Sequence, residues 1–213
     1  MRLDHVSYAA GPEGLASCVQ RLGATLGASF RDGGLHPRFG TRNFVLPLAG
    51  DTYLEVVEAL DHPAVDTAPF GRAVRARTES GGGWLGWAVR VDDLAPVEQR
   101  LGRKAVDGHR RRPDGFDLRW LQLGVNELSD DPQLPYFVHW LSPPQEHPSF
   151  GGSAIALREI EIAGDEKAVD DYLGVSTSQP LEGLAVDWLE PDADDTGLVA
   201  AVFDTAYGAV RID

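Results

Sequence analysis

The feature that most constrains this 213-residue chain is an order of elements that occurs twice: strand, helix, weak strand, strand, strand. In the first half, residues 3–10 alternate like a short strand, and residues 13–26 have the apolar spacing of a helix. The Gly- and Pro-rich stretch 30–40 is expected to form turns or an irregular strand. Residues 41–60 predict two strands joined by a turn at Ala49-Gly50-Asp51.

The same order returns in the second half. Trp84–Val91 predicts a strand, and Asp92-Asp93 can cap a following helix that has Pro96 in its first turn. Residues 110–115 predict a charged turn, and residues 116–124 and 134–142 predict two further strands. The chain therefore contains a duplicated unit.

The tail, residues 156–212, predicts strand, helix, strand and one or two final strands. We interpret it as a truncated third unit, or as an extension that covers an exposed sheet edge. The predicted fold class is α+β, with tandem βαβββ modules forming a curved, half-open barrel with helices outside, plus a partial third βαββ unit. The predicted organisation is a first module (1–62), a connector with a short helix (63–83), a second module (84–150) and a C-terminal partial module (151–213).

Composition limits the partners and the compartment. The formal net charge of −14 repels phosphate backbones and anionic membranes, so nucleic acid is not an expected partner. Cys18 is the single cysteine, so no internal disulfide can form. No stretch approaches the roughly 18 apolar residues of a membrane helix. We expect a cytoplasmic protein that binds a small molecule, with a homodimer compatible with the architecture.

Five stretches carry a resemblance to known proteins: LDHVSYA, GGLHPRFGTRN, YLEVVEA, LPYFVHW and EHPS. They resemble the vicinal oxygen chelate superfamily and, more narrowly, the glyoxalase-like domain family. The matching stretches span residues 1 to about 150, and the HP..GT.N pattern before YLE is the most specific of them. The tail matches less clearly.

The resemblance implies a concave pocket with a divalent metal ion (Fe, Mn, Zn or Ni), held by the first and last strands of each module. Carried onto this sequence, it places His5, Glu55 and His139 as metal ligands. Trp84 stands where a fourth ligand would be. Two imidazoles and one carboxylate leave open coordination positions. There a substrate's paired oxygens could bind, and an enolate-like intermediate could be stabilised.

Strand alternation gives an independent test of these positions, because one face of a strand has a period of two. Alternation places His5 on the concave side, together with Tyr53 and Glu55 of a later strand. In the closing strand it places Phe137 and His139 inside. The remaining residues of that strand are predicted to face the helices: Tyr136, Val138 and Trp140.

The predicted pocket is lined by Tyr53, Trp84 and Phe137, which suit an apolar or aromatic ligand. His36 is expected either to line the pocket mouth or to cap a turn. Asn43 is expected to order its loop, with contact to substrate as the alternative.

A basic run, His109 to Arg112, is expected to be a solvated turn, and the alternative is that it neutralises an anionic substrate near the pocket. Each metal candidate also has a purely structural interpretation: His5 as a core histidine, Glu55 as an ion-pair partner of an arginine, and His139 as an edge-strand residue.

Three functions follow as hypotheses. The first is a metal-dependent enzyme that isomerises, epimerises, cleaves or ring-opens a small oxygenated molecule, as a lyase, isomerase or dioxygenase. The second is a metal-free protein of the same fold that sequesters a hydrophobic or aromatic compound, as resistance proteins do. The third, a structural or partner-binding module, is supported by no feature beyond the acidic surface.

Overall fold

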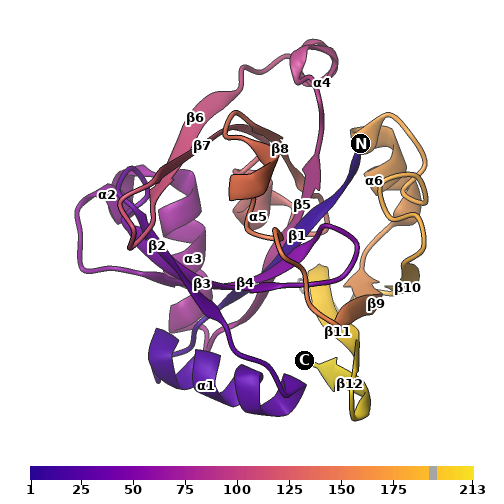
Figure 1. Ribbon diagram of the computed structural model, residues 1–213. Coiled ribbons are helices and arrows are strands. Elements are labelled where there is room, and N and C mark those ends of the chain that lie inside the picture. The colour runs from indigo at the N-terminus through magenta and orange to yellow at the C-terminus, as the bar shows by residue number, and fades with distance from the viewer. Residues whose placement is uncertain (192–195) are drawn as a thin grey trace.

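The computed structural model describes residues 1–191 and 196–213, and it contains a closed eight-stranded barrel beside a four-stranded sheet (Figure 1). The barrel strands are β1 (Arg2–Ala9), β2 (Arg31–His36), β3 (Thr41–Pro47), β4 (Tyr53–Ala59), β5 (Gly83–Arg90), β6 (Val106–Arg111), β7 (Asp117–Leu123) and β8 (Tyr136–Trp140). The helices between them are α1 (Leu15–Leu26), α2 (Ala64–Thr67), α3 (Pro69–Glu79), α4 (Ala95–Leu101) and α5 (Glu127–Asp130).

The two modules have the same strand order, β1-β4-β3-β2 and β5-β8-β7-β6. They meet along β1 and β5, which pair antiparallel over most of their length. The other seam, between β2 and β6, is a single pair, Leu35 with Arg111. The predicted fold class is confirmed, and this one pair closes the ring that the sequence predicted to be half-open.

Helix α1 covers the outer face of the first module. Its buried residues include Cys18 and Leu22, which pack in one core with the outward residues Val6 and Leu54. The helix ends at Gly27, whose left-handed conformation (φ 65°) is the usual way to stop a helix. Cys18 is a free, buried cysteine in this core.

The C-terminal unit covers the outer face of the second module. It consists of β9 (Ala156–Ala163), α6 (Glu166–Leu173), β10 (Ala185–Leu189), β11 (Gly197–Thr205) and β12 (Gly208–Ile212), preceded by the short helix η1 (Pro144–Glu146). Its sheet, in the order β10-β9-β11-β12, is separate from the barrel. The unit therefore packs on a face of the barrel instead of extending an edge. Residues 192–195 of the predicted C-terminal module lie outside the described residues.

Aromatic contacts join this unit to the barrel. The Trp84 ring on β5 is stacked on Phe203, with centroids 6.5 Å apart, and its Nε1 donates to the Ile212 carbonyl at 3.1 Å. The Phe137 ring on β8 lies 5.6 Å from Tyr172. These side chains therefore belong to the outer core.

Helix α3 closes part of the barrel interior. Its buried residues Phe70 and Val74 share a second core with Val57 of β4, Leu85 of β5 and Leu128 of α5. The predicted connector helix is therefore a wall of the interior. Among the described residues, no helix has the length and apolar character that a membrane crossing needs.

We expect Phe203→Ala to lower the free energy of unfolding by about 3–5 kcal/mol, because Phe203 is fully buried between the C-terminal sheet and Trp84. Urea denaturation of the whole chain measures the change. Phe150→Ala is the matched control, since Phe150 is 57% exposed, and it should change the free energy by less than about 0.5 kcal/mol. Equal effects would contradict the packing described here.

Candidate functional site

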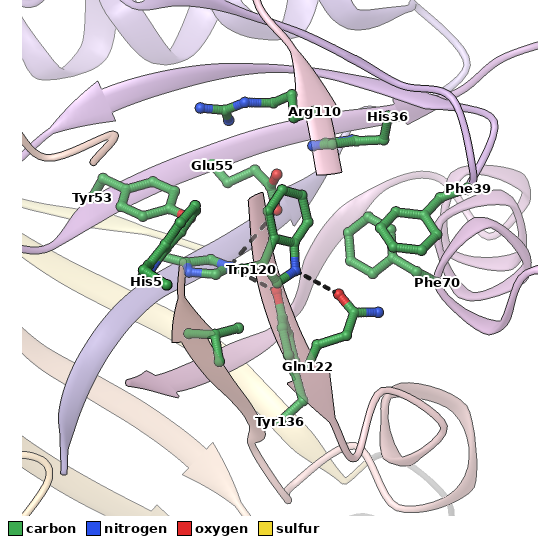
Figure 2. Close-up of a pocket in the computed structure, with 12 residues that line it drawn as sticks. His5, His36, Phe39, Tyr53, Glu55, Phe70, Arg110, Trp120, Gln122 and Tyr136 are labelled. Carbon is green, nitrogen blue, oxygen red and sulfur yellow. Dashed lines mark hydrogen bonds and ion pairs between the residues drawn. The ribbon is translucent and has the colours of Figure 1, made fainter. Parts of the chain in front are cut away.

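A cavity of about 400 Å³, counting its open mouth, lies inside the barrel (Figure 2). Its lining comes from both modules and from α3: His5, His36, Phe39, Tyr53, Glu55, Phe70, Arg110, Trp120, Gln122, Tyr136, Val138 and Trp140. The lining combines aromatic walls with a few buried polar groups.

Three side chains form a hydrogen-bond chain at the base of the cavity. His5 Nδ1 lies 2.8 Å from Asp4 Oδ2, and His5 Nε2 lies 2.7 Å from the Tyr136 hydroxyl. An ionised carboxylate only accepts hydrogen bonds, so Nδ1 carries the proton toward Asp4. In the neutral ring, Nε2 then accepts from Tyr136. The arrangement orients one imidazole between a carboxylate and a phenol.

Asp4 is completely buried and has several donors around it. Its Oδ1 accepts from Trp140 Nε1 at 3.0 Å and from His147 Nε2 at 3.1 Å, and Arg90 Nε lies 3.4 Å away. Burial alone would raise the pKa of Asp4, but the hydrogen bonds from His147 and His5 outweigh it and hold this pKa far below its usual value. Asp4 is therefore a permanent anion.

Glu55 is a second buried carboxylate. Its oxygens accept from Ser7 Oγ at 2.8 Å and from Asn43 Nδ2 at 2.5 Å, and Oε2 lies 4.0 Å from His5 Nε2. Burial alone would raise the pKa of Glu55, but the interaction with His5 and the two hydrogen bonds hold it below the usual value. Glu55 is ionised at neutral pH.

His36 and Arg110 lie on the side of the cavity opposite Tyr136 in Figure 2. His36 Nδ1 lies 2.9 Å from Thr41 Oγ1, and burial lowers the pKa of this imidazole to about 3, so it is neutral. The Arg110 side chain is only 3% exposed. Burial lowers the pKa of its guanidinium, which nonetheless stays charged at neutral pH.

The cavity's apolar end is a cluster of rings. The Phe39 centroid lies 5.7 Å from that of Phe70 and 6.3 Å from that of Trp120, and Trp120 lies 5.4 Å from Trp140. Tyr53 stacks on His5 at 4.5 Å. Burial raises the pKa values of Tyr53 and Tyr136 well above 10, so both side chains are neutral hydroxyls.

The structure brings together part of the predicted site. His5, Glu55, Tyr53 and His36 line the cavity, and Asn43 contacts it through Glu55. The other three predicted residues lie elsewhere. Trp84 and Phe137 are in the outer core, and His139 lies in a separate surface cleft, where its Nδ1 is 3.1 Å from the Val91 carbonyl.

In β8 the sequence-based prediction exchanged the inward and outward faces of the strand. Tyr136, Val138 and Trp140 face the cavity, whereas Phe137 and His139 face outward. Both faces of β8 are covered, one by the cavity lining and the other by the C-terminal unit, so hydrophobicity does not reveal which face is inside. His139 is therefore not placed with the predicted metal ligands.

The error at Trp84 has a different cause. The pairing of β5 with β1 shifts between Ser7 and Tyr8, where the partner changes from Gly86 to Trp84 and omits Leu85. Such a bulge reverses the alternation beyond it. Leu85 therefore points into the interior core and Trp84 points out.

The residues present do not fit the predicted three-ligand metal centre. Only His5 and Glu55 of the proposed set share the cavity, and their nearest nitrogen and oxygen already interact with Tyr136 and Ser7. In the part of the chain that the structure describes, no group of three His, Cys, Asp or Glu side chains has the arrangement needed to hold a metal ion.

Sequence reasoning missed three site residues and gave a fourth, Arg110, only as an alternative. Asp4 neighbours His5 on a strand and should face away, but a register shift between Leu3 and His5 lets both contribute. Tyr136 was assigned to the wrong face. His147 is 7% exposed, and its Nε2 donates to Asp4 Oδ1. Arg110, expected in a solvated turn with contact to an anionic substrate as the alternative, is an inward residue of β6.

A barrel of two βαβββ modules around a polar cavity is the architecture of the vicinal oxygen chelate superfamily. More narrowly, the chain belongs to the glyoxalase-like domain family, whose model matches residues 3–173. This membership confirms the resemblance noted in the sequence.

Several solved structures are similar to this chain. A hypothetical protein from Staphylococcus aureus is 12% identical, with a TM-score of 0.59 and coverage of 100% of this chain and 85% of that chain. Methylmalonyl-CoA epimerase from Mycobacterium tuberculosis is 16% identical (TM-score 0.44; coverage 67% and 89%). A variant of the Streptomyces coelicolor epimerase in complex with 2-nitronate-propionyl-CoA is 18% identical (TM-score 0.46; coverage 67% and 99%). A search of curated proteins finds no match.

We expect Asp4→Asn to lower the free energy of unfolding by about 3 kcal/mol at pH 7, because it leaves His5, His147 and Arg90 without their shared anion. The folded-state pKa of Asp4 is lowered, so its stabilisation is complete above the usual carboxyl value of about 3.9 and is lost as the pH falls below it. Urea denaturation at pH 7, 5 and 3 should show the difference from wild type shrinking toward pH 3. Exposed Asp61→Asn should show no such trend, and a constant difference for Asp4→Asn would oppose this assignment.

We expect protein purified without a histidine tag to hold no stoichiometric divalent metal, because the donors at the site are too few. Added Zn²⁺, Mn²⁺, Ni²⁺ or Fe²⁺ should not raise the melting temperature, since a ligand of the native state must stabilise it. Elemental analysis and thermal melting measure both. Stoichiometric metal that disappears in His5→Ala and Glu55→Ala but persists in His139→Ala would contradict our interpretation of the site.

Proposed function

We propose that this protein is an enzyme that moves a proton on a small carbonyl compound, using Tyr136, His5 and Asp4. The observation that carries the proposal is the continuous hydrogen-bond chain from the cavity to a buried carboxylate, with steps of 2.7 and 2.8 Å. A base oriented by a buried anion is a recurrent arrangement for proton transfer.

The proton would reach His5 through Tyr136. A substrate C–H proton passes to the Tyr136 oxygen as the hydroxyl proton passes to His5 Nε2. Burial raises the pKa of Tyr136, which disfavours a free phenolate and so requires the two transfers to be coupled. The result is an imidazolium and a substrate enolate, and the reverse steps return the proton.

Two carboxylates favour the charged intermediate. The imidazolium would have Asp4 2.8 Å from Nδ1 and Glu55 4.0 Å from Nε2. At such distances the Coulomb attraction is substantial in a buried site. Glu55 acts here as a fixed anion, because its two hydrogen bonds and low pKa make it a weak base.

This chemistry supports an isomerase, an epimerase or a lyase. Returning the proton to another atom or to the other face of the same carbon gives the first two, and loss of a leaving group from the enolate gives the third. We do not propose the ring-cleaving dioxygenase, because that hypothesis depends on the three-ligand centre to which His139 does not contribute.

The second candidate is a metal-free binding protein, and the ring cluster of Phe39, Phe70, Trp120 and Trp140 favours it. Rings at these separations pack against one another and present an apolar wall to the cavity. A binding protein would not need the oriented Tyr136–His5 pair. Proton exchange therefore separates the two candidates.

We expect the wild-type protein to catalyse exchange of the α-protons of phenylpyruvate or of phenylacetone in D₂O, measured by loss of the proton NMR signals. Tyr136→Phe should reduce the rate by about 100-fold or more, because it removes the group that transfers the proton. Tyr207→Phe, at a tyrosine that is 87% exposed, is the matched control and should keep the wild-type rate.

A Tyr136→Phe protein that melts like wild type and exchanges at the wild-type rate would refute the proposed role. Wild-type exchange no faster than buffer with both ketones, together with binding of either one, would support the binding protein instead.

A further inference from the structure

The cavity contains a buried positive charge without an ion-pair partner. Arg110 projects inward from β6 and is 3% exposed, and its Nε has no hydrogen-bond partner among the described residues. Within the same part of the chain, no carboxylate forms an ion pair with it. Leaving a buried charge unpaired is costly, so such a group is usually retained for a ligand.

The two carboxylates nearest to Arg110 in charge interaction already form hydrogen bonds or ion pairs with other groups. Glu55 accepts from Ser7 and Asn43, and Asp32 accepts from the Gly34 amide at 2.9 Å and pairs with Arg42 at 3.4 Å. Both attract Arg110 only from a longer distance. The Arg110 guanidinium therefore keeps donors free for another anion.

The backbone beside Arg110 leaves space for the guanidinium because residue 33 is a glycine. A Cβ at Gly33 would collide with Asn43 Oδ1 and would lie 3.0 Å from Arg110 Nη1. The missing side chain thus makes room for both polar groups. Neutral His36, on the same side of the cavity, can add a hydrogen bond without changing the net charge.

We infer that the substrate is a small carboxylate with an apolar or aromatic body, and that Arg110 binds its carboxylate. The planar guanidinium matches a carboxylate with two parallel hydrogen bonds. The rings of Phe39, Phe70 and Trp120 line the same cavity and give the apolar body an apolar wall to pack against. The inference rests on the proposed function, since it names the molecule whose proton Tyr136 moves.

The arrangement also gives Arg110 a role in the reaction. Figure 2 shows Arg110 and Tyr136 on opposite sides of the cavity, so a substrate held by its carboxylate can present a neighbouring carbon to Tyr136. A cation near the developing enolate lowers the energy of the transition state. Arg110 is therefore both a binding group and a stabiliser of charge.

The test compares acids with their neutral amides of the same shape. Benzoate and phenylacetate should raise the melting temperature of the whole chain and give measurable affinities by calorimetry, whereas benzamide and phenylacetamide should bind at least tenfold more weakly. Arg110→Gln should weaken binding of the acids by about 10- to 100-fold and leave the amides unchanged. Arg111→Gln, at the exposed next residue of β6, is the matched control and should bind like wild type.

Two further measurements keep the outcome decisive. Arg110→Gln without ligand should melt no lower than wild type, because it removes an unpaired buried charge; a variant that folds but melts well below wild type would show a structural role for Arg110. Should that variant fail to fold, the wild-type comparison of acid with amide still decides. Acids that bind no better than their amides would overturn the inference.

The failures of the inference and of the proposed function are separable. Tyr136→Phe should bind benzoate or phenylacetate as wild type does, whatever its exchange rate. Exchange of phenylacetone without preference for acids would refute the role of Arg110 and leave the proton-transfer function standing. Tight, Arg110-dependent binding of acids with no exchange would refute the enzyme and leave the carboxylate site standing.

Discussion

The buried carboxylate of Asp4 is the interaction on which the rest of the site depends. It receives hydrogen bonds from His5 on its own strand, from Trp140 on β8 and from His147 beyond η1, and it pairs with Arg90 on β5. Groups from both modules and from the segment that leads to the C-terminal unit therefore converge on one anion. The same contact that joins these parts fixes the tautomer of His5, so fold stability and the proposed chemistry are coupled.

Duplication explains why the site lies where it does. The modules pair extensively along β1 and β5, so the inward residues of β1, β4 and β8 meet near that seam. The opposite seam is a single residue pair, Leu35 with Arg111, and Arg110 is the next residue along β6. The proton-transfer groups thus lie by the strongly paired seam, and the proposed anion-binding group lies by the weakly paired one.

The sequence predicted the fold class and the inward faces of β1 and β4, because each of those strands has a helix-covered outer face and a polar inner one, as His5 and Glu55 show. It could not predict β8, where Phe137 and Tyr136 both pack against apolar groups. The side of the strand on which Trp84 lies was predicted wrongly, because a β-bulge cannot be recognised from the alternation of apolar and polar residues in the sequence. Arg110 was assigned to a solvated turn because three consecutive arginines resemble a surface segment, and only the pairing of β6 with β7 shows that one of them points inward.

Opposite buried charges in one cavity normally neutralise each other, and here they do not. Ser7 and Asn43 occupy the oxygens of Glu55, so this carboxylate has fewer lone pairs to offer Arg110. Without the hydrogen bond from Asn43, Glu55 would be freer to attract the guanidinium and close the space between them. The amide of Asn43 therefore keeps the anion beside His5 and the cation available to a ligand. A cavity with separated charges of this kind favours a substrate that is itself an anion at one end and becomes negative at the other as its proton leaves.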